Sequence, residues 1–496
     1  MNISFELRQT IGMQFVLDRM QPCTPYGDEL VKNLYYYTPE QKSELEKELE
    51  NVDLVYSSLQ NHKNEYEQIK LVMTRMKDIR RSLQNCLEKI CLSQVEFFEI
   101  KRFLIQLGEL LPVFSSIEKI KLLDGIKFDD LREVLELIDP NNPDRIGFFI
   151  SDNRSERLSQ IRIEKKRIEM QINKAVDREE KDDLKLLRQG ICIKEDDEEQ
   201  AIREELTLAL IPYADKLLAN IKSIGRFDFI LQKAQLAAEF NGVKPIIVEE
   251  AIIMKDMVNP QVQELLKEKQ CEFTPVCIEL VKGVTVITGA NMGGKSIALK
   301  TLALNAILAH AGFFSFAGRV ELPILHSVQC IFDSAQSLEK GLSGFAAEII
   351  DFKAALQEVE KGFSLFLLDE FARGTNPDEG AMIVKGVARY LNGKNAITVM
   401  ATHYDNITQE GNAHYQVIGL QKMDREKVMA QLEAEPGNSL AIIARYMDYG
   451  LYRVYGKEDC PKDALNICRL LELDSEIISH IEQLQKTSQN GSCCQV

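Results

Sequence analysis

The apolar residues of the first 240 positions recur every three or four residues, which is the spacing that places them on one face of a helix. The longest such stripe is predicted between residues 69 and 90, and a second of the same period covers 45–59. A charged helix is predicted over about 154–176, and another amphipathic helix follows the acidic cluster at 195–199. Long charged helices with narrow apolar stripes are typical of levers or coiled coils, so we predict an all-α domain over residues 1–240.

From about residue 245 the pattern changes to short apolar, β-branched runs that alternate with helical segments. Strands are predicted at 284–288, 363–368 and 396–400, and helices are predicted from Lys295 and near 378–391. Apolar strands that alternate with helices are typical of an α/β domain with a mainly parallel sheet. We therefore predict a second domain of this class over residues 241–435.

Beyond this domain the sequence predicts short helices over 436–485 and a disordered polar tail over 486–496. The helices carry an apolar stripe formed by Ala464, Ile467, Leu471, Ile477 and Ile481. This stripe is a candidate subunit interface, and packing on the core of the chain's own α/β domain is the alternative.

Composition narrows the class of protein. With 60 Lys and Arg against 76 Asp and Glu, the net charge of -16 argues against a protein whose whole surface binds nucleic acid. A local basic cluster at Arg162, Lys165, Lys166 and Arg167 could still contact phosphates, and a solvated mixed-charge helix face is the alternative. The eleven cysteines form no C-x-x-C pair, no secretory signal begins the chain, and no apolar run approaches the ~20 residues that span a bilayer. We expect a cytoplasmic protein with reduced thiols and no membrane association.

A phosphate-binding motif follows the first predicted strand of the α/β domain. Residues 289–296 match G-x-x-x-x-G-K-[ST] and lie where a strand ends and a helix begins. Backbone N–H groups of such a loop surround a phosphate, which also meets the positive end of the helix dipole. The predicted nucleotide-binding residues are Gly289, Asn291, Met292, Gly293, Gly294, Lys295 and Ser296. Lys295 would reach the β- and γ-phosphates and Ser296 would ligate Mg²⁺, whereas a glycine-rich turn by chance is the alternative.

The other two predicted strands end in residues suited to ATP hydrolysis. Asp369 and Glu370 follow an apolar strand, where the first could hold Mg²⁺ through water and the second could orient and deprotonate the attacking water. His403 follows the next strand and could sense the γ-phosphate. Sites of open α/β sheets collect at the carboxyl ends of strands, which favours a shared site over ordinary solvated strand ends.

These motifs together resemble the MutS ATPases, which are related to the ABC ATPases. The resemblance is carried by TGANMGGKS (288–296, with Ala290 in place of the usual Pro), LLDEFARGTNPDEG (367–380), ATHYDN (401–406) and GLSGFAAEI (341–349). It implies that Ser343 acts on the nucleotide of a partner subunit, although Gly344 replaces the usual Thr. It also implies that Phe273, in FTPVCIEL, stacks on adenine; a core phenylalanine is the alternative.

The resemblance extends over nearly the whole chain. Residues 17–39 resemble the entry to the family's lever core, where Thr24 and Gly27 match its T-x-x-G form, and 224–245 resemble its last lever helix. Residues 452–478 resemble the closing helix-turn-helix that wraps a second subunit. The implied architecture is an ABC-like P-loop ATPase domain after an all-α lever core, with a shortened clamp region at about 150–200.

The implied function is a Mg²⁺-dependent ATPase whose homodimer couples ATP binding and hydrolysis to movement of the levers. Because the resemblance includes neither the mismatch-recognition domains nor a full clamp domain, we expect action on DNA structure rather than on mispairs. The alternative is a protein client, such as a B12-dependent aminomutase that the levers reactivate. ATP and Mg²⁺ are the expected cofactors in either case.

Overall fold

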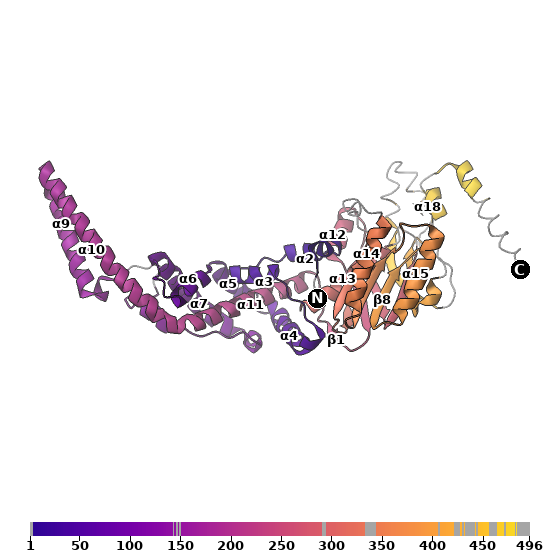
Figure 1. Ribbon diagram of the computed structural model, residues 1–496, viewed down its shortest axis with the longest axis horizontal. Coiled ribbons are helices and arrows are strands. Elements are labelled where there is room, and N and C mark those ends of the chain that lie inside the picture. The colour runs from indigo at the N-terminus through magenta and orange to yellow at the C-terminus, as the bar shows by residue number, and fades with distance from the viewer. Residues whose placement is uncertain are drawn as a thin grey trace. The chain divides into compact units, whose positions relative to one another are not determined.

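In the computed structural model the chain forms two compact units (Figure 1). The residues that the structure describes are 3–141, 143–144, 147, 150–289, 294–332, 344–404, 407–420, 427–428, 431, 442, 445–455, 464–470, 473–481 and 483. The helical unit comprises residues 21–33 and 54–232, and the sheet unit comprises 1–20, 34–53 and 233–496.

Two N-terminal segments belong to the sheet unit, so the division differs from the single boundary predicted at residue 240. Buried Lys233 holds one of them, because its Nζ lies 2.7 Å from Oε1 of Glu48 and donates to the Ala311 carbonyl at 3.0 Å. Asn259 holds the other, because its Nδ2 donates to the Ile11 carbonyl at 3.0 Å. An unpaired cation is costly to bury, so the segment that carries Glu48 stays with the sheet unit.

The helical unit is built from helices alone among its described residues. They are α3 (Pro25–Lys32), α5 (Lys63–Thr74), α6 (Arg80–Leu87), α7 (Gln94–Ser116), η2 (Glu118–Leu122), α8 (Arg132–Ile138), η3 (Asp152–Arg154), α9 (Glu156–Lys174), α10 (Arg178–Leu210) and η4 (Ile211–Tyr213). Helices α4 (Lys42–Leu59) and α11 (Ala214–Glu239) have residues in both units. The all-α character predicted for this part of the chain is confirmed.

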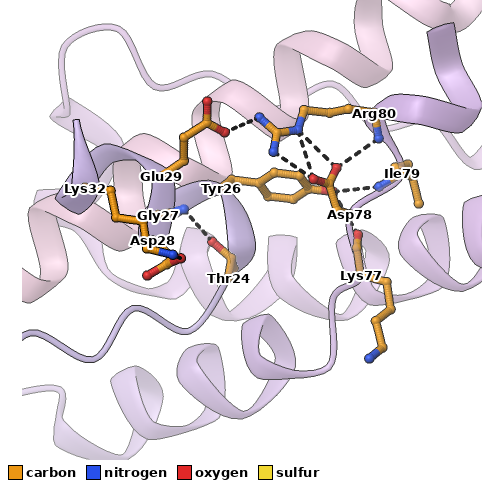
Figure 2. A network of polar contacts seen from close by, with 10 residues as sticks. All are labelled: Thr24, Tyr26, Gly27, Asp28, Glu29, Lys32, Lys77, Asp78, Ile79 and Arg80. Carbon is orange, nitrogen blue, oxygen red and sulfur yellow. Dashed lines mark hydrogen bonds and ion pairs between the residues drawn. The ribbon is translucent and has the colours of Figure 1, made fainter.

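The apolar stripe predicted as continuous between 69 and 90 is interrupted between α5 and α6. Tyr26 causes the break, because its hydroxyl donates to the Lys77 carbonyl at 2.8 Å and accepts from the Ile79 N–H at 3.3 Å (Figure 2). These contacts replace helical hydrogen bonds at the turn. The predicted stripe is therefore divided between two helices, although its members Ile69, Ile79 and Leu83 are buried as the pattern indicates.

A buried carboxylate explains the Thr24 and Gly27 pair. Oδ2 of Asp228 accepts from the Thr24 N–H at 2.8 Å and from its hydroxyl at 2.7 Å, and that hydroxyl accepts from the Gly27 N–H at 3.0 Å. A Cβ on Gly27 would lie 2.4 Å from Asp228 Oδ2. Burial raises the pKa of Asp228, and the hydrogen bonds from Cys23 and Thr24 oppose the shift. Gly27 is needed because α3 approaches α11 this closely.

The acidic cluster at 195–199 lies inside α10 rather than ahead of a new helix, which corrects the sequence-based boundary. The helix ends where Pro212 enters η4, because proline lacks the N–H that would continue the hydrogen-bond ladder. Helices α9 and α10 pack side by side as a hairpin, with Ile161, Ile168 and Ile191 buried between them (Figure 1).

Arg162 is buried in this hairpin. It therefore neither contacts phosphates nor belongs to a solvated helix face, the two interpretations of the basic cluster. Its guanidinium donates to Glu195 at 2.9 Å and to Glu199 at 2.7 Å, and it also pairs with Asp152. The Arg162 side chain is only 7% exposed and is therefore not available for phosphate contacts. Lys166 and Arg167 are the exposed members of the cluster.

The sheet unit contains a six-stranded sheet of order β10-β9-β4-β8-β7-β6, in which β9–β10 is antiparallel and the other pairs are parallel. Its strands are β4 (Gly283–Thr288), β6 (Ser327–Ile331), β7 (Ser364–Asp369), β8 (Ala396–Ala401), β9 (Ala413–Gly419) and β10 (Asp448–Val454). A second sheet of order β1-β5-β2-β3 contains β1 (Ile246–Ile247), β2 (Ile252–Met257), β3 (Val276–Leu280) and β5 (Arg319–Leu322). The α/β class and the three predicted strands are confirmed. The large sheet continues past residue 435, because β10 forms where short helices are predicted.

The helices of the sheet unit are α1 (Phe5–Thr10), α2 (Met13–Asp18), η1 (Pro39–Gln41), α12 (Pro260–Glu268), α13 (Lys295–His310), α14 (Gly344–Val359), α15 (Pro377–Asn392), η6 (Thr408–Glu410) and α18 (Ala464–Leu470). Helices α14 and α15 cover one face of the six-stranded sheet, where they bury Phe366 and Leu368 of β7 (Figure 1). In the predicted helix-turn-helix at 452–478, the first three residues belong to β10 and Ala464–Leu470 form α18, whereas 456–463 and 471–472 lie outside the described residues. In the described part of the chain, no helix is long and apolar enough to cross a membrane.

Replacing Gly27 by Ala should destabilise the helical unit, because the new Cβ cannot coexist with Asp228 in its present place. Gly108 is a matched control in α7, where an added Cβ would meet no atom within 4 Å. Gly108→Ala should stabilise its helix by about 0.5–1 kcal/mol, since alanine loses less backbone entropy. Thermal unfolding of the two variants should shift in opposite directions; equal shifts would contradict the account of Thr24 and Gly27.

Arg162→Met should loosen the α9–α10 hairpin, because Glu195 and Glu199 would remain poorly solvated without the guanidinium. Breaking a buried ion-pair network by removing one partner typically costs about 3–5 kcal/mol. Hydrogen exchange of α9 and α10 should accelerate in this variant, whereas the exposed control Arg167→Met should leave it unchanged. Equal exchange in both variants would show that Arg162 does not hold the hairpin together.

Candidate active site

Three central strands of the six-stranded sheet end at the same edge and carry the predicted chemistry there. Ile287 of β4 and Asp369 of β7 both pair with Ala401 of β8, so the three residues form one row across the sheet. The chain continues from these strands to the phosphate-binding motif, to Glu370 and to His403. The parallel registers therefore bring together three segments that lie far apart in the chain.

The turn between β4 and α13 requires glycine at both of its described ends. Gly289 has φ +137° and Gly294 has φ +93°, values that L side chains rarely adopt. A Cβ on Gly294 would also lie 2.4 Å from Cδ1 of Tyr449 in β10. The predicted contacts of Asn291, Met292 and Gly293 lie outside the described residues, as does Ser343.

Lys295 is the first residue of α13 and is only 3% exposed. Its Nζ donates to the Gly289 carbonyl at 2.8 Å, which ties together the two ends of the motif. The same Nζ lies 3.5 Å from Oε1 of Glu370. The structure thus places the predicted phosphate-binding cation directly beside the predicted water-orienting carboxylate.

Asp369 and Ser296 form the part of the site suited to a metal ion. The Ser296 hydroxyl hydrogen-bonds to the Asp369 carboxylate, and burial raises the pKa of Asp369 in spite of this bond. Within the part of the chain that the structure describes, Oδ1 of Asp369 has no hydrogen-bond partner. A buried carboxylate oxygen without a donor, next to a hydroxyl, offers the hard oxygen ligands that Mg²⁺ prefers. The residues present therefore fit a magnesium ion.

Glu370 is held in a strained conformation between two cations. Its φ is +49°, and its backbone N–H donates to the Ala401 carbonyl at 2.9 Å. Oε2 lies 2.8 Å from Arg373, while Oε1 faces Lys295. Sequence reasoning missed Arg373, although its position three residues after Glu370 in the same motif was a usable signal.

His403 lies at the end of β8, as predicted, with its ring 4.5 Å from that of Tyr404. Desolvation lowers the pKa of His403, and the Glu370 carboxylate opposes this shift. The imidazole is therefore neutral at pH 7 and can donate one hydrogen bond and accept another. Phe273 is half-buried in the loop before β3, and its contact with adenine stays a prediction.

Sequence reasoning also missed Tyr449, Glu348 and Tyr404, which support the site from three other elements. The Tyr404 hydroxyl donates to the Ala372 carbonyl at 3.0 Å, and Glu348 Oε2 accepts from the Ala372 N–H at 3.1 Å. No local pattern indicates such contacts, because they depend on how distant elements pack.

Comparison with known proteins agrees with this geometry. The family model of MutS domain V matches residues 285–445, the segment that contains Lys295, Asp369, Glu370 and His403. This segment is therefore similar to MutS domain V, although it covers less than half of the chain. The resemblance to MutS proteins is thereby confirmed, whereas nothing in the comparison bears on an aminomutase.

Several curated relatives are also similar to part of this chain. An "Endonuclease MutS2" of a Geobacillus species is 34% identical over 223 residues, which is 44% of this chain and 28% of that protein. An "Endonuclease MutS2" of Acetivibrio thermocellus is 34% identical over 217 residues, or 43% and 27%. A "DNA mismatch repair protein MutS" of Thermodesulfovibrio yellowstonii is 29% identical over 294 residues, or 58% and 32%. The matches cover less than a third of each of these relatives.

Proposed function

We propose that this chain is a Mg²⁺-dependent ATPase that works as a homodimer and acts on DNA structure. The observation that supports hydrolysis best is the buried Lys295, which begins a helix and faces Glu370. Beside it lies Asp369, whose Oδ1 has no hydrogen-bond partner among the described residues. Phosphate binding needs the cation and the helix N-terminus, and hydrolysis needs the carboxylates. The described residues supply all of these groups at one edge of a sheet.

Nucleotide binding would use the first turn of α13. Its N–H groups carry the positive end of the helix dipole, which favours an anion at this position. Lys295 would exchange its contact with the Gly289 carbonyl for the β- and γ-phosphate oxygens. Little reorganisation is needed, because burial has already fixed the Lys295 side chain.

A magnesium ion bound by Ser296, and by Asp369 through water, would neutralise charge that develops on the phosphate oxygens. Asp369 must then be ionised, although burial raises its pKa. The cations Lys295 and Lys300 nearby favour the ionised form. Protons and magnesium therefore compete for the Asp369 carboxylate.

Hydrolysis would begin when Glu370 turns from Arg373 and Lys295 to a water molecule in line with the γ-phosphorus. A bond forms between the water oxygen and the γ-phosphorus, the bond to the β–γ bridging oxygen breaks, and Glu370 accepts the proton. The products are ADP and inorganic phosphate. The neutral His403 would donate a hydrogen bond to the γ-phosphate and so distinguish ATP from ADP.

The dimer and its client form the second part of the proposal. Ser343 would complete the site of the partner subunit, so that two ATP molecules bind between two chains and their hydrolysis moves the helical levers. DNA as the client is supported by the printed names of the relatives, an endonuclease and a mismatch repair protein. The expected lack of mismatch reading favours recognition of DNA structure, through phosphate contacts.

A protein client is the second candidate, and the structure contains an observation in its favour. Burial removes Arg162 from the only basic cluster that the sequence analysis assigned to phosphate contacts, and the net charge is -16. Binding of branched and linear duplex DNA over a range of salt concentrations separates the candidates. If the chain binds DNA through phosphates, the logarithm of its association constant for DNA should fall linearly with the logarithm of the salt concentration. If its client is a protein, the chain should not bind DNA at physiological salt.

Substitutions of Lys295 and of Glu370 should impair ATP hydrolysis at different steps. Lys295→Ala should abolish ATP binding, because it removes the buried cation that faces the phosphates. Glu370→Gln should bind ATP and hydrolyse it about 10²–10⁴-fold more slowly, since shape is kept while the proton acceptor is lost. Fluorescent nucleotide binding and phosphate release measure the two effects separately. Undiminished turnover in Glu370→Gln would remove this residue from its role.

A further inference from the structure

The chain leaves β7 through a strained turn. Glu370 and Ala372 both have positive φ, +49° and +63°, although neither is glycine. Such residues are strained and persist only where surrounding contacts hold them. The direction of the Glu370 side chain therefore depends on whatever fixes this turn.

Two side chains from separate elements hold Ala372 by its main chain. Glu348 of α14 accepts from its N–H at 3.1 Å, and Tyr404, after β8, donates to its carbonyl at 3.0 Å. Ala372 is fully buried, so no water can replace either partner. Both backbone groups of one strained residue are thus satisfied by side chains rather than by secondary structure.

The absence of a side chain at Gly380 leaves room for the Tyr404 contact. A Cβ on Gly380 of α15 would lie 2.3 Å from the Tyr404 hydroxyl and 2.9 Å from the Ala372 carbonyl oxygen. Any larger residue at 380 would push Tyr404 away from Ala372. The charges of Glu348 and Glu370 raise the pKa of Tyr404 after the larger effect of burial, which reflects how close these groups lie.

We propose that Glu348 and Tyr404 are positioning residues that aim Glu370 at the attacking water by bracing the peptide groups of Ala372. The inference rests on the proposed ATPase function and adds two residues to it. Neither side chain needs to touch the nucleotide. We call the contacts of Glu348 and Tyr404 with Ala372 the brace. Tyr404 directly follows His403, and Glu348 belongs to the 341–349 segment. The brace therefore joins these two segments to the one that carries Glu370, at the buried residue Ala372.

The test compares steady-state ATP hydrolysis with nucleotide affinity in Glu348→Ala, Glu348→Gln and Tyr404→Phe. Loss of either contact should lower kcat by about tenfold to a hundredfold, because a catalytic group displaced by about 1 Å loses that much rate. Affinity for ADP should stay at the wild-type value, since Lys295 and Ser296 are untouched. Glu348→Gln should retain wild-type kcat, because the glutamine amide oxygen can still accept from the Ala372 N–H.

Tyr415→Phe is the matched control. The Tyr415 hydroxyl also donates to a backbone carbonyl, that of Glu279, at 3.1 Å, and Tyr415 is 5% exposed in β9. This variant should hydrolyse ATP at the wild-type rate. A fall in kcat as large as that of Tyr404→Phe would overturn the proposal, because it would reveal a general effect of losing a buried hydroxyl.

Wild-type kcat in both Glu348→Ala and Tyr404→Phe would overturn the brace and leave the ATPase function intact. A parallel loss of ADP affinity and kcat would also overturn it, because the variants would then be damaged as a whole. A wild-type protein that hydrolyses no ATP with Mg²⁺ would overturn the proposed function, and the brace with it. The wild-type rate thus separates the two failures.

Discussion

A lysine that is almost completely withdrawn from water must be paired, and in this chain that requirement determines the arrangement of the site. Lys295 is 3% exposed, and its Nζ has both a carbonyl oxygen and the Glu370 carboxylate within 3.5 Å. An unpaired ammonium at this depth would lose its proton or destabilise the fold by several kcal/mol. The carbonyl and the carboxylate belong to different strand ends, so the pairing of Lys295 fixes how these strand ends meet.

The parallel sheet brings the strand ends that pair with Lys295 to one edge. Because β4, β8 and β7 are parallel and in register, Ile287, Ala401 and Asp369 line up at one edge. Gly289, Glu370 and His403 follow this row by one or two positions and therefore lie at the same edge of the sheet. Gly289 and Gly294 have the positive φ angles at the two described ends of the phosphate-binding motif, and Tyr449 packs where Gly294 has no side chain.

The sequence predicts the parts of this site that are local. β4, β7 and β8 are buried at every position, so they appear as continuous apolar runs, and the phosphate-binding motif and the Asp369–Glu370 pair each occupy a few consecutive residues. The supporting residues are not local. Glu348 and Tyr404 reach Ala372 from α14 and from beyond β8, and their types alone indicate nothing about this contact.

The same distinction explains the errors in the helical unit. The periodicity between 69 and 90 is real, but it spans a break between α5 and α6, where Tyr26 binds the backbone groups of Lys77 and Ile79. Arg162 looks like a surface cation in the sequence, and only the pairing of α9 with α10 places Glu195 and Glu199 around it. Each error comes from a long-range contact that overrides a correct local pattern.

Magnesium-dependent binding of ADP by wild-type protein and by Asp369→Asn tests the central claim, that the edge formed by α13 and β7 is a metal–nucleotide site. Titration calorimetry with and without Mg²⁺ should show that the ion strengthens ADP binding to wild-type protein. In Asp369→Asn this gain should fall about tenfold or more, because a group that holds the ion through water contributes on that scale, while ADP binding without Mg²⁺ persists through Lys295. An equal gain from Mg²⁺ in both proteins would contradict the assignment of Asp369 and the site built around it.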